Sequence, residues 1–397
     1  MFKNILTTSA GVIALGLANF LPTLALAAGS GCVDQNWIDM TDTEFARNCA
    51  GMAFSDSLEN RETMAWMLFT RVNQLIADDH NGGMSETNLV PVWMSWATDP
   101  DTFATRKRFK FKAVRRASIM PVSEKRELHA GTVSTIDPDG SNEEAMRNPI
   151  SYDYLVDSGL TTKRDVAEFF KNNDYVDMPI GSIELKGAWL QITDDSPAPD
   201  GALTFQFSSG HYWLRGLHIM AKMRHLDDPK RMFYTEESSW FWTTFEFNRS
   251  PGVEQVRKNL ITQRSPLDDR LIDDILRIAN LDGFGFEQYA PNGTQIRFTV
   301  DGLGTTPVVL GHTAMEDFAG APNTAQSQYW TSFEASCHSC HATASYNPDT
   351  ATFFPLSVPK GALDPSYNHE DKSGTTQYLG QGFKPLDFMW PITFQAK

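Results

Sequence analysis

Residues 337–341 read Cys337-His338-Ser339-Cys340-His341, and this stretch constrains the fold more than any other in the chain. In the pattern C-x-x-C-H, each thiol can form a thioether bond with one vinyl group of haem, and the adjacent histidine can bind the iron as proximal ligand. The motif therefore predicts one covalent haem c bound by Cys337, Cys340 and His341. A zinc site or a redox-active dithiol would also use C-x-x-C, but neither needs the histidine that follows.

The N-terminus indicates that the chain is exported. Lys3 supplies a positive charge, an apolar run follows over residues 5–26, and Ala25-Leu26-Ala27 is a small-x-small cleavage pattern. These are the features of a secretory signal peptide, so we assign residues 1–27 to it and expect the mature protein in the periplasm. Covalent haem attachment and disulfide formation both fit that oxidising compartment.

The four cysteines divide into two pairs. If Cys337 and Cys340 hold haem, Cys32 and Cys49 remain, and no other pairing leaves the haem motif intact. We therefore predict a Cys32–Cys49 disulfide that fixes the mature N-terminus. A disulfide that closes so short a loop is expected to contribute roughly 3 kcal/mol to the stability of the protein.

Length and charge exclude some classes of protein. Signal cleavage leaves 370 of the 397 residues, enough for one large domain or two ordinary ones. A formal net charge of −15 argues against nucleic acid as a partner. After the signal peptide, no segment approaches the roughly 18 consecutive apolar residues of a membrane span, so no integral membrane segment is expected.

Residues 28–180 are expected to form a mainly helical N-terminal region with one basic strand. Helices are predicted over 44–53, with Thr41 or Thr43 as cap, over 57–76, and over about 162–170. Arg106–Arg116 carries seven basic residues that alternate with Phe109 and Phe111, which predicts a strand with one basic face. That face is either a solvated surface, or a docking patch or counter-ion for haem propionates. Residues 121–149 are expected to form a surface loop.

Residues 181–397 are expected to form a strand-rich haem-binding region, which could be one continuous domain with residues 28–180. Strands are predicted over 181–193, 203–207, 214–223 and 240–247, and Gly and Pro turns separate them. A helix is predicted from the Ser265-Pro266 cap to Gly283, a strand over 295–300 after an Asn292-Gly293 turn, a helix over 326–335 before the haem motif, and a strand-like tail over 383–394. The predicted fold is therefore α+β, an antiparallel β-sheet core flanked by helices, with the haem attached near the C-terminus.

The second axial position of the iron would decide the function. Met389 follows His341 by 48 residues, a spacing that suits the Met ligand of a small cytochrome c, although the tail after the motif is turn-rich and short. His218 and His312 are the other candidates, each as a distal ligand, as a distal hydrogen-bond donor or as an ordinary core residue. A Met ligand in a closed pocket is typical of an electron carrier, whereas an open position lets small molecules reach the iron.

Further residues near these positions could take part in the chemistry. Glu184, Glu246 and Glu316 are candidate proton relays, and each could instead be a structural hydrogen-bond partner. His338, inside the haem motif, is expected to point away from the iron and to be exposed.

Four stretches carry a family resemblance: SIELKGAW at 182–189, GLHIMAK at 216–222, WFWTTFE at 240–246 and CHSCH at 337–341. They resemble a family of exported single-haem "cytochrome c family" proteins of unsettled function, over about residues 182–342 and more weakly at 93–96. A remoter similarity is to the β-fold cytochromes c′ and their hydroxylamine-oxidising relatives, which also place C-x-x-C-H after an antiparallel sheet. In those relatives a lysine is cross-linked to haem, so the resemblance implies Lys186 or Lys222 as a candidate.

The sequence therefore predicts a periplasmic monohaem c-type cytochrome that takes part in electron transfer with periplasmic redox partner proteins. The alternative is a haem enzyme or small-molecule binder with an open distal site, acting on peroxide, nitrogen oxides or hydroxylamine-like substrates. The long stretch before the motif favours this alternative, because a carrier needs only a small domain. A third possibility is that the haem serves as a sensor or as a structural element of a binding protein.

Overall fold

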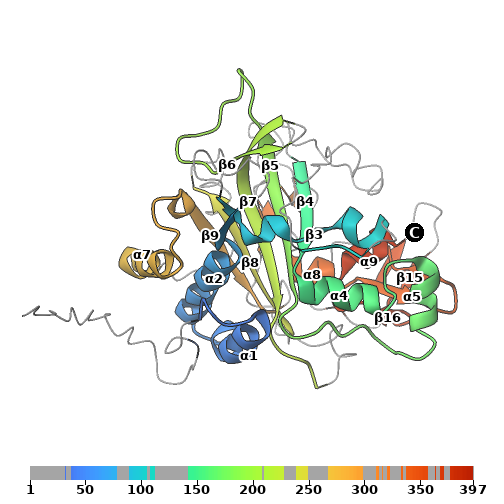
Figure 1. The fold of residues 1–397 in the computed structure, drawn as a ribbon. Helices are drawn as coiled ribbons and strands as arrows, with labels where there is room; N and C mark the ends of the chain where they lie inside the picture. Colours follow the sequence, from blue (N-terminus) through green and yellow to red (C-terminus); the bar gives the residue numbers. More distant parts are fainter. Residues whose placement is uncertain are drawn as a thin grey trace, which may run out of the picture.

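The computed structural model is drawn in Figure 1. It describes residues 37–77, 89–104, 108–111, 142–207, 210–227, 238–248, 267–297, 310–312, 337–355, 367–370 and 376–396, together with Cys32, Met315, 320–321, 332–333 and Leu363. The predicted signal peptide and Glu316 lie outside the described residues.

A seven-stranded antiparallel sheet forms the centre of the described structure (Figure 1). Its strands are β3 (Ala97–Thr98), β4 (Asn142–Arg147), β5 (Ile183–Gln191), β6 (Thr204–Phe207), β7 (Gly210–Lys222), β8 (Trp240–Phe247) and β9 (Tyr289–Gln295). The strand order is β3-β4-β5-β7-β8-β9, and β6 pairs with β7 outside this path. The α+β class with an antiparallel sheet is therefore confirmed, as are the four strands predicted between residues 181 and 247.

The two faces of the sheet follow from the alternation of side chains along each strand. Leu217, Ile219 and Phe245 belong to one apolar core. The neighbouring residues Met220 and Trp242 belong to a second core, on the opposite face. Helix α8 (Cys337–His341) packs on this second face, which we call the α8 face.

Helices of the N-terminal region cover the first face. Helix α1 (Asp42–Ala53) begins at a Thr41 capping box, and α2 (Leu58–Val72) begins at the Ser57 cap. The ring of Phe69 in α2 stacks on Phe245 of β8 with centroids 4.1 Å apart. Helix α7 (Asp269–Ile278) packs beside α2, so the three helices shield one face of the sheet from water.

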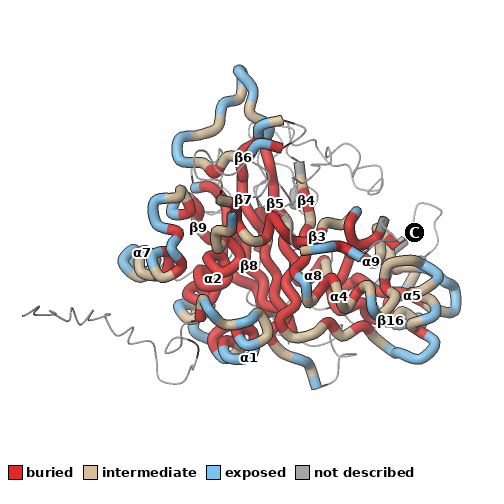
Figure 2. The backbone as a smooth tube through the Cα atoms, viewed as in Figure 1, coloured by how far each residue is buried: buried red, intermediate tan, exposed pale blue. Residues whose placement is uncertain are grey.

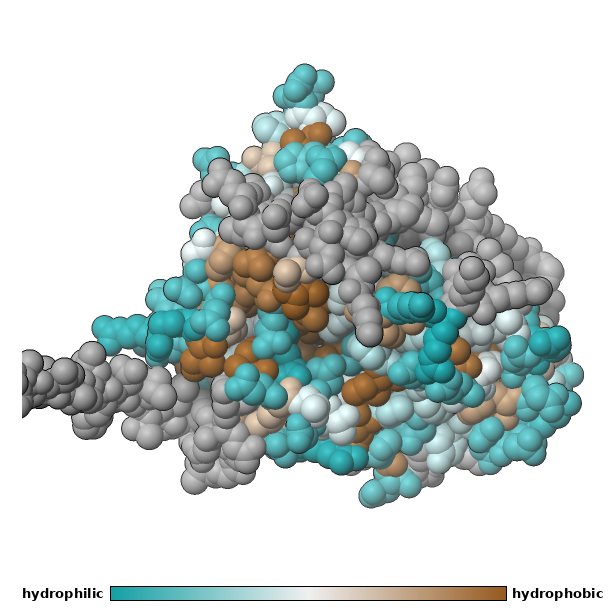
Figure 3. All heavy atoms as spheres, viewed as in Figure 1, coloured by the Kyte–Doolittle hydropathy of each residue, from teal (hydrophilic) through white to brown (hydrophobic). Residues whose placement is uncertain are grey.

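The α8 face is covered mainly by helix α4 and by the C-terminal part of the chain. Its surroundings include α4 (Pro149–Asp157), α5 (Lys163–Phe169), a small sheet of β12 (Ser345–Asn347), β13 (Thr352–Phe353) and β16 (Lys384–Pro385), and α9 (Trp390–Gln395). Figure 2 shows the central strands buried between these layers, with exposed residues at the periphery. In the space-filling view (Figure 3), hydrophilic residues cover the lower rim, whereas hydrophobic ones gather towards the centre.

The remaining described elements are short. They are β1 (Leu75–Ala77), β2 (Leu89–Pro91), η1 (Val92–Ser95), the π-helix η2 (Pro100–Ala104), η5 (Phe286–Gln288), β10 (Gly320–Ala321), β11 (Ser332–Phe333), β14 (Asn368–Glu370) and β15 (Thr376–Tyr378).

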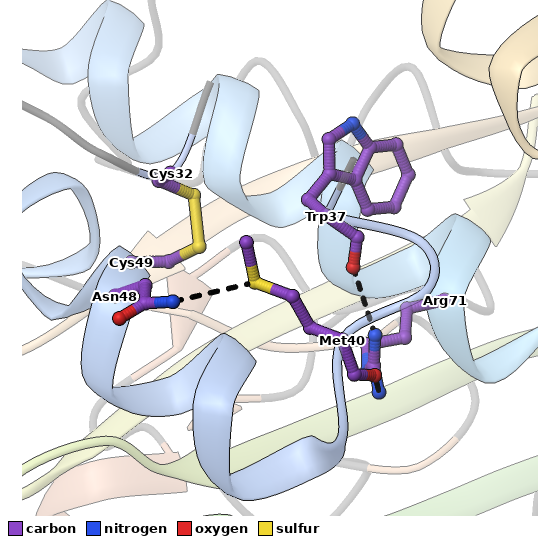
Figure 4. Close-up of a disulfide and its surroundings, with 6 residues drawn as sticks. All are labelled: Cys32, Trp37, Met40, Asn48, Cys49 and Arg71. Atoms are coloured by element: carbon purple, nitrogen blue, oxygen red, sulfur yellow. Dashed lines mark hydrogen bonds between the residues drawn. A yellow bond between two sulfur atoms is a disulfide. The ribbon is translucent and has the colours of Figure 1, made fainter. Parts of the chain in front are cut away.

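The predicted Cys32–Cys49 disulfide is confirmed (Figure 4). Both sulfurs are buried, and Cys49 lies in α1. Close by, Arg71 of α2 donates a hydrogen bond to the carbonyl oxygen of Trp37 at 3.0 Å. The disulfide and this arginine therefore hold the segment before α1 against the first two helices.

Several predicted elements in the N-terminal region are wrong. The second helix ends at Val72 instead of residue 76, because Leu75–Ala77 forms β1 and pairs with β2. The expected loop over 121–149 contains β4, which pairs with β5 through its backbone. Residues 108–111 of the expected basic strand are not a strand, and Arg108 instead forms ion pairs with Asp153 and Asp157 of α4.

Four predictions in the C-terminal region are also wrong. Asn292 and Gly293 are inside β9, not in a turn: Gly293 pairs with Thr244 of β8, and Asn292 lies beside it where the register of the two strands shifts. Residues 332–333 of the expected helix form β11. The α7 cap is Asp268, whose carboxylate accepts from the backbone N–H of Arg270, and not Ser265. The strand-like tail ends in helix α9.

Candidate functional site

The C-x-x-C-H motif forms the short helix α8, and both of its cysteines are buried. Neither cysteine takes part in a disulfide. Residues three and four positions apart share one side of a helix, so Cys337, Cys340 and His341 point to the same side. The Sγ of Cys337 lies 3.6 Å from the carbonyl oxygen of Leu310 and 4.0 Å from Nδ1 of His218.

His341 is held by the tail of the chain. Its Nδ1 lies 2.7 Å from the carbonyl oxygen of Phe388. A carbonyl oxygen can only accept a hydrogen bond, so Nδ1 carries the proton and Nε2 keeps its lone pair. Burial lowers the pKa of His341 to about 4, although the hydrogen bond to Phe388 raises it; Lys186 and His218 lower it further, and the imidazole is neutral at pH 7. This is the tautomer and charge state that binds a metal through Nε2.

His338 is buried, so its predicted exposure is wrong. Its ring lies 4.8 Å from that of Phe388 and 6.4 Å from that of Trp242, between centroids. Its backbone N–H donates to the side chain of Gln295 in β9 at 3.0 Å. Burial lowers the pKa of His338 to about 3. The ring is buried because α8 lies against the sheet and the tail covers its other side.

A polar row crosses the sheet beneath α8. Lys186 of β5, His218 of β7 and Thr244 of β8 are directly opposite one another in register, so they share the α8 face. The Nδ1 of His218 lies 2.6 Å from Oγ1 of Thr244. Lys186 forms an ion pair with Glu143 of β4 at 2.7 Å. This row places two of the sequence-predicted candidates, His218 and Lys186, beside the haem motif.

His312 and Glu246 extend this polar region. The ring of His312 lies 5.8 Å from that of His218, and its Nδ1 lies 3.8 Å from Oε1 of Glu246. Asn292 donates to the other oxygen of Glu246 at 2.9 Å and to Gly311 at the same distance. The side chains of His312, Glu246 and Asn292 are all buried. The structure therefore brings together His218, His312 and Glu246, which are far apart in the sequence.

Met389 lies in a different place. It is buried, and it follows Phe388, the residue whose carbonyl contacts Nδ1 of His341. Its backbone N–H donates to the carbonyl oxygen of Leu386 at 3.0 Å, and it is the N-cap residue of α9. The backbone of Met389 is thus close to Nδ1 of His341, on the side of the ring away from Nε2.

Glu184 and Lys222 belong to two other polar clusters on the α8 face. Glu184 pairs with the buried Arg147 at 3.3 Å and also accepts from Ser151. Burial raises its pKa to about 7, although Arg147 and Ser151 both lower it. Lys222 forms a buried ion pair with Asp387 at 2.7 Å.

Three residues at this site were missed by the sequence reasoning. Trp242 packs against the ring of His341 at 4.9 Å, Phe388 anchors Nδ1 of His341, and Asp387 pairs with Lys222. The signal for Asp387 was Lys222 itself, because a lysine that directly follows three apolar residues in a buried strand needs a buried partner. No local pattern pointed to Phe388, since it acts through its backbone.

The residues present fit a covalently bound haem. They supply two thiols on one side of a helix, a neutral imidazole with Nε2 available, and the aromatic rings of Trp242 and Phe388. The buried Nε1 of Trp242 has no hydrogen-bond partner among the described residues, so this donor is available to a bound group. The described residues contain no group of three or more His, Cys, Asp or Glu that could hold a metal ion. A haem needs only one or two protein ligands to its iron.

Comparisons of the chain with models of known families, with curated proteins and with solved structures give no match. Within the described part of the chain, no helix has the length and apolar character needed to cross a membrane.

Proposed function

We propose that this protein is a periplasmic monohaem c-type cytochrome that takes part in electron transfer. The observation that carries the proposal is the geometry of α8. Two buried cysteines outside any disulfide share one side of the helix with His341, whose Nδ1–H is fixed on Phe388 and whose Nε2 is left for iron. The confirmed Cys32–Cys49 disulfide supports an oxidising compartment.

When bound, haem would supply a one-electron redox centre, and the protein would tune its potential. Cys337 and Cys340 would fix the group, and His341 would be its proximal ligand. Trp242 and Phe388 would exclude water from the proximal imidazole, because both are buried, the first contacting it through its ring and the second through its carbonyl oxygen. Electrons would then be exchanged with periplasmic redox partner proteins.

Haem staining after denaturing electrophoresis tests this proposal. The full chain, with its signal peptide, is expressed in a bacterial host that attaches haem c. We expect staining of the wild type, clear loss of stain in Cys337→Ala and Cys340→Ala, and retained stain in the control Cys32→Ser/Cys49→Ser. Absence of stain in the wild type would refute covalent attachment and leave a zinc or dithiol site as the reading of the motif.

A second candidate function is supported by the polar cluster of His218, His312 and Glu246. Two imidazoles and a carboxylate beside the attachment helix could hold and move protons at a distal site open to peroxide, nitrogen oxides or hydroxylamine-like substrates. Carbon monoxide distinguishes the two functions. A six-coordinate carrier should bind it slowly or not at all when reduced, whereas rapid binding would favour the enzyme or small-molecule binder.

Of the three candidate distal residues, we favour His218. It lies in the sheet beside α8, with its Nδ1 2.6 Å from Oγ1 of Thr244, and it is close enough to His341 to lower the pKa of that residue. Met389 is disfavoured because its backbone lies on the Nδ1 side of His341.

A further inference from the structure

A buried carboxylate anchors the part of the tail that contacts His341. The side chain of Asp387 is fully buried, and its Oδ2 lies 2.7 Å from Nζ of Lys222 in β7. The indole Nε1 of Trp240 in β8 donates to Oδ1 at 3.0 Å, and the backbone N–H of Met178 donates to Oδ2 at 2.7 Å. Asp387 is therefore tied to two neighbouring strands of the central sheet and to the segment before β5.

The backbone around Asp387 has a conformation that side chains disfavour. Asp387 and Phe388 have φ angles of 51° and 67°, in the left-handed region that glycine usually occupies. The turn is closed by the backbone hydrogen bond from Met389 to Leu386, and Leu386 in turn donates to Ala344, just after α8. Two consecutive left-handed residues without glycine persist only where the surroundings hold them, and the contacts of Asp387 do so.

This turn determines where the carbonyl of Phe388 points. Phe388 immediately follows Asp387, and its carbonyl oxygen accepts from Nδ1 of His341 at 2.7 Å. A continuous series of contacts thus runs from Lys222 and Trp240 through Asp387 to His341. If the turn relaxed, the carbonyl would leave Nδ1, and the ring of His341 would lose the contact that fixes its tautomer and orientation.

We infer that Asp387 is a positioning residue for the haem-ligating histidine, which it orients through the carbonyl of Phe388. This inference rests on the proposed function, because it assigns His341 to the iron. A hydrogen bond from Nδ1–H makes an iron-bound imidazole a stronger electron donor, which stabilises the oxidised form. Asp387 should therefore lower the reduction potential without touching the haem ligand.

Two aspartates contact Lys222, and this provides a matched control. Asp177 also pairs with Lys222, at 3.0 Å, but it is partly exposed and pairs with His225 at the surface as well. Asp177→Asn removes one carboxylate from Lys222 and leaves the tail untouched. Asp387→Asn removes the other and releases the turn. Trp240→Phe provides an independent variant, because it keeps an aromatic side chain at this buried position and removes the Nε1 donor to Asp387 together with part of the indole ring.

The experiment measures the midpoint potential and the absorption spectrum of the purified haem-loaded variants, with circular dichroism to check the fold. We expect Asp387→Asn to keep covalent haem and to have a higher midpoint potential and an altered spectrum of the oxidised form. Trp240→Phe should shift the potential in the same direction by less, and Asp177→Asn should match the wild type.

A folded Asp387→Asn with the wild-type potential would overturn the inference, and so would an equal shift in Asp177→Asn, which would assign the effect to the charge of Lys222. If Asp387→Asn does not fold, Trp240→Phe decides: a raised potential supports the role of Asp387, and an unchanged one overturns it. A wild type without covalent haem would overturn the proposed function. If the wild type and the variants all carry haem and have equal potentials, only the role of Asp387 is overturned.

Discussion

Cys337 and His218 are 119 residues apart in the sequence, yet the cysteine Sγ lies 4.0 Å from Nδ1 of the histidine. This contact joins helix α8 to the middle of β7, where Nδ1 of His218 lies 2.6 Å from Oγ1 of Thr244 in β8. The motif therefore does not begin a separate small domain. It packs on a sheet formed by earlier parts of the chain, and the candidate distal residue His218 comes from that sheet.

Replacement of His218 should change the coordination of the iron, whereas replacement of Met389 should not. We expect His218→Ala to convert the oxidised protein to a high-spin spectrum and to let the reduced protein bind carbon monoxide rapidly. Met389→Leu, a conservative change on the Nδ1 side of His341, should keep the wild-type spectrum. Absorption spectroscopy of both variants would contradict this assignment if only Met389→Leu changed the spin state.

An alanine at Gly216 should disturb the polar cluster. A Cβ at this position would lie 2.3 Å from the carbonyl oxygen of Phe245 and 2.4 Å from Nε2 of His312, so backbone and ring would both have to move. We expect Gly216→Ala to lower the free energy of unfolding by about 1–3 kcal/mol, measured by denaturant titration.

Gly51 in α1 provides the control for Gly216. Nothing lies within 4 Å of a Cβ placed at Gly51, so Gly51→Ala should be neutral or stabilise the protein by about 0.5–1 kcal/mol. If both alanine variants had the same stability as the wild type, the position of His312 against β7 would be wrong.

Loss of the N-terminal disulfide should affect stability but not haem attachment. Cys32 and Cys49 are 17 residues apart, and closing a loop of that length contributes about 3 kcal/mol. Cys32→Ser/Cys49→Ser should therefore unfold at a lower denaturant concentration and still stain for haem. A reductant should lower the unfolding midpoint of the wild type, in denaturant concentration, to that of this variant. A wild-type midpoint that reductant leaves unchanged would contradict the prediction.

Glu184 should make the stability depend on pH. Burial raises its pKa from 4.5 to about 7, so between these values the folded protein holds a proton that the unfolded chain has released. The contribution of Glu184 to the free energy of unfolding is therefore fully present below pH 4.5. It falls as the pH rises from 4.5 to about 7, by about 1.4 kcal/mol for each pH unit.

The variant Glu184→Gln isolates this effect, because the amide resembles the protonated acid and does not titrate. We expect the difference in unfolding free energy, wild type minus variant, to fall between pH 4.5 and pH 7. A difference that grew with pH would mean that the ion pair with Arg147 dominates and that the pKa is lowered instead.

The sequence predicted the local features of the fold well. Strand-like stretches between Gly and Pro turns predicted β8 with its observed bounds and β5, β6 and β7 within a few residues, and Thr41, one of the two predicted caps, begins α1. It missed β4 because Glu143, Glu144 and Arg147 make the strand appear polar, although Glu144 and Arg147 are buried and Arg147 pairs with Asp99 and Glu184.

The candidate site was predicted only in part for the same reason. The C-x-x-C-H pattern at residues 337–341 could be found from the sequence alone, because its spacing is the one that haem c attachment requires. The contacts of His341 with Phe388 and of Lys222 with Asp387 join segments 47 and 165 residues apart, and no local pattern encodes such pairs. The burial of His338 likewise depends on the tail that closes over α8.

The most direct test of the account is the intact mass of the mature protein, purified from a bacterial host that attaches haem c. Covalent attachment at Cys337 and Cys340 predicts a mass that exceeds the chain after residue 27 by that of one haem, less two hydrogens for the Cys32–Cys49 disulfide. It also predicts that no thiol remains for alkylation after denaturation. A mature chain without the added mass of haem, with Cys337 and Cys340 open to alkylation, would contradict the account.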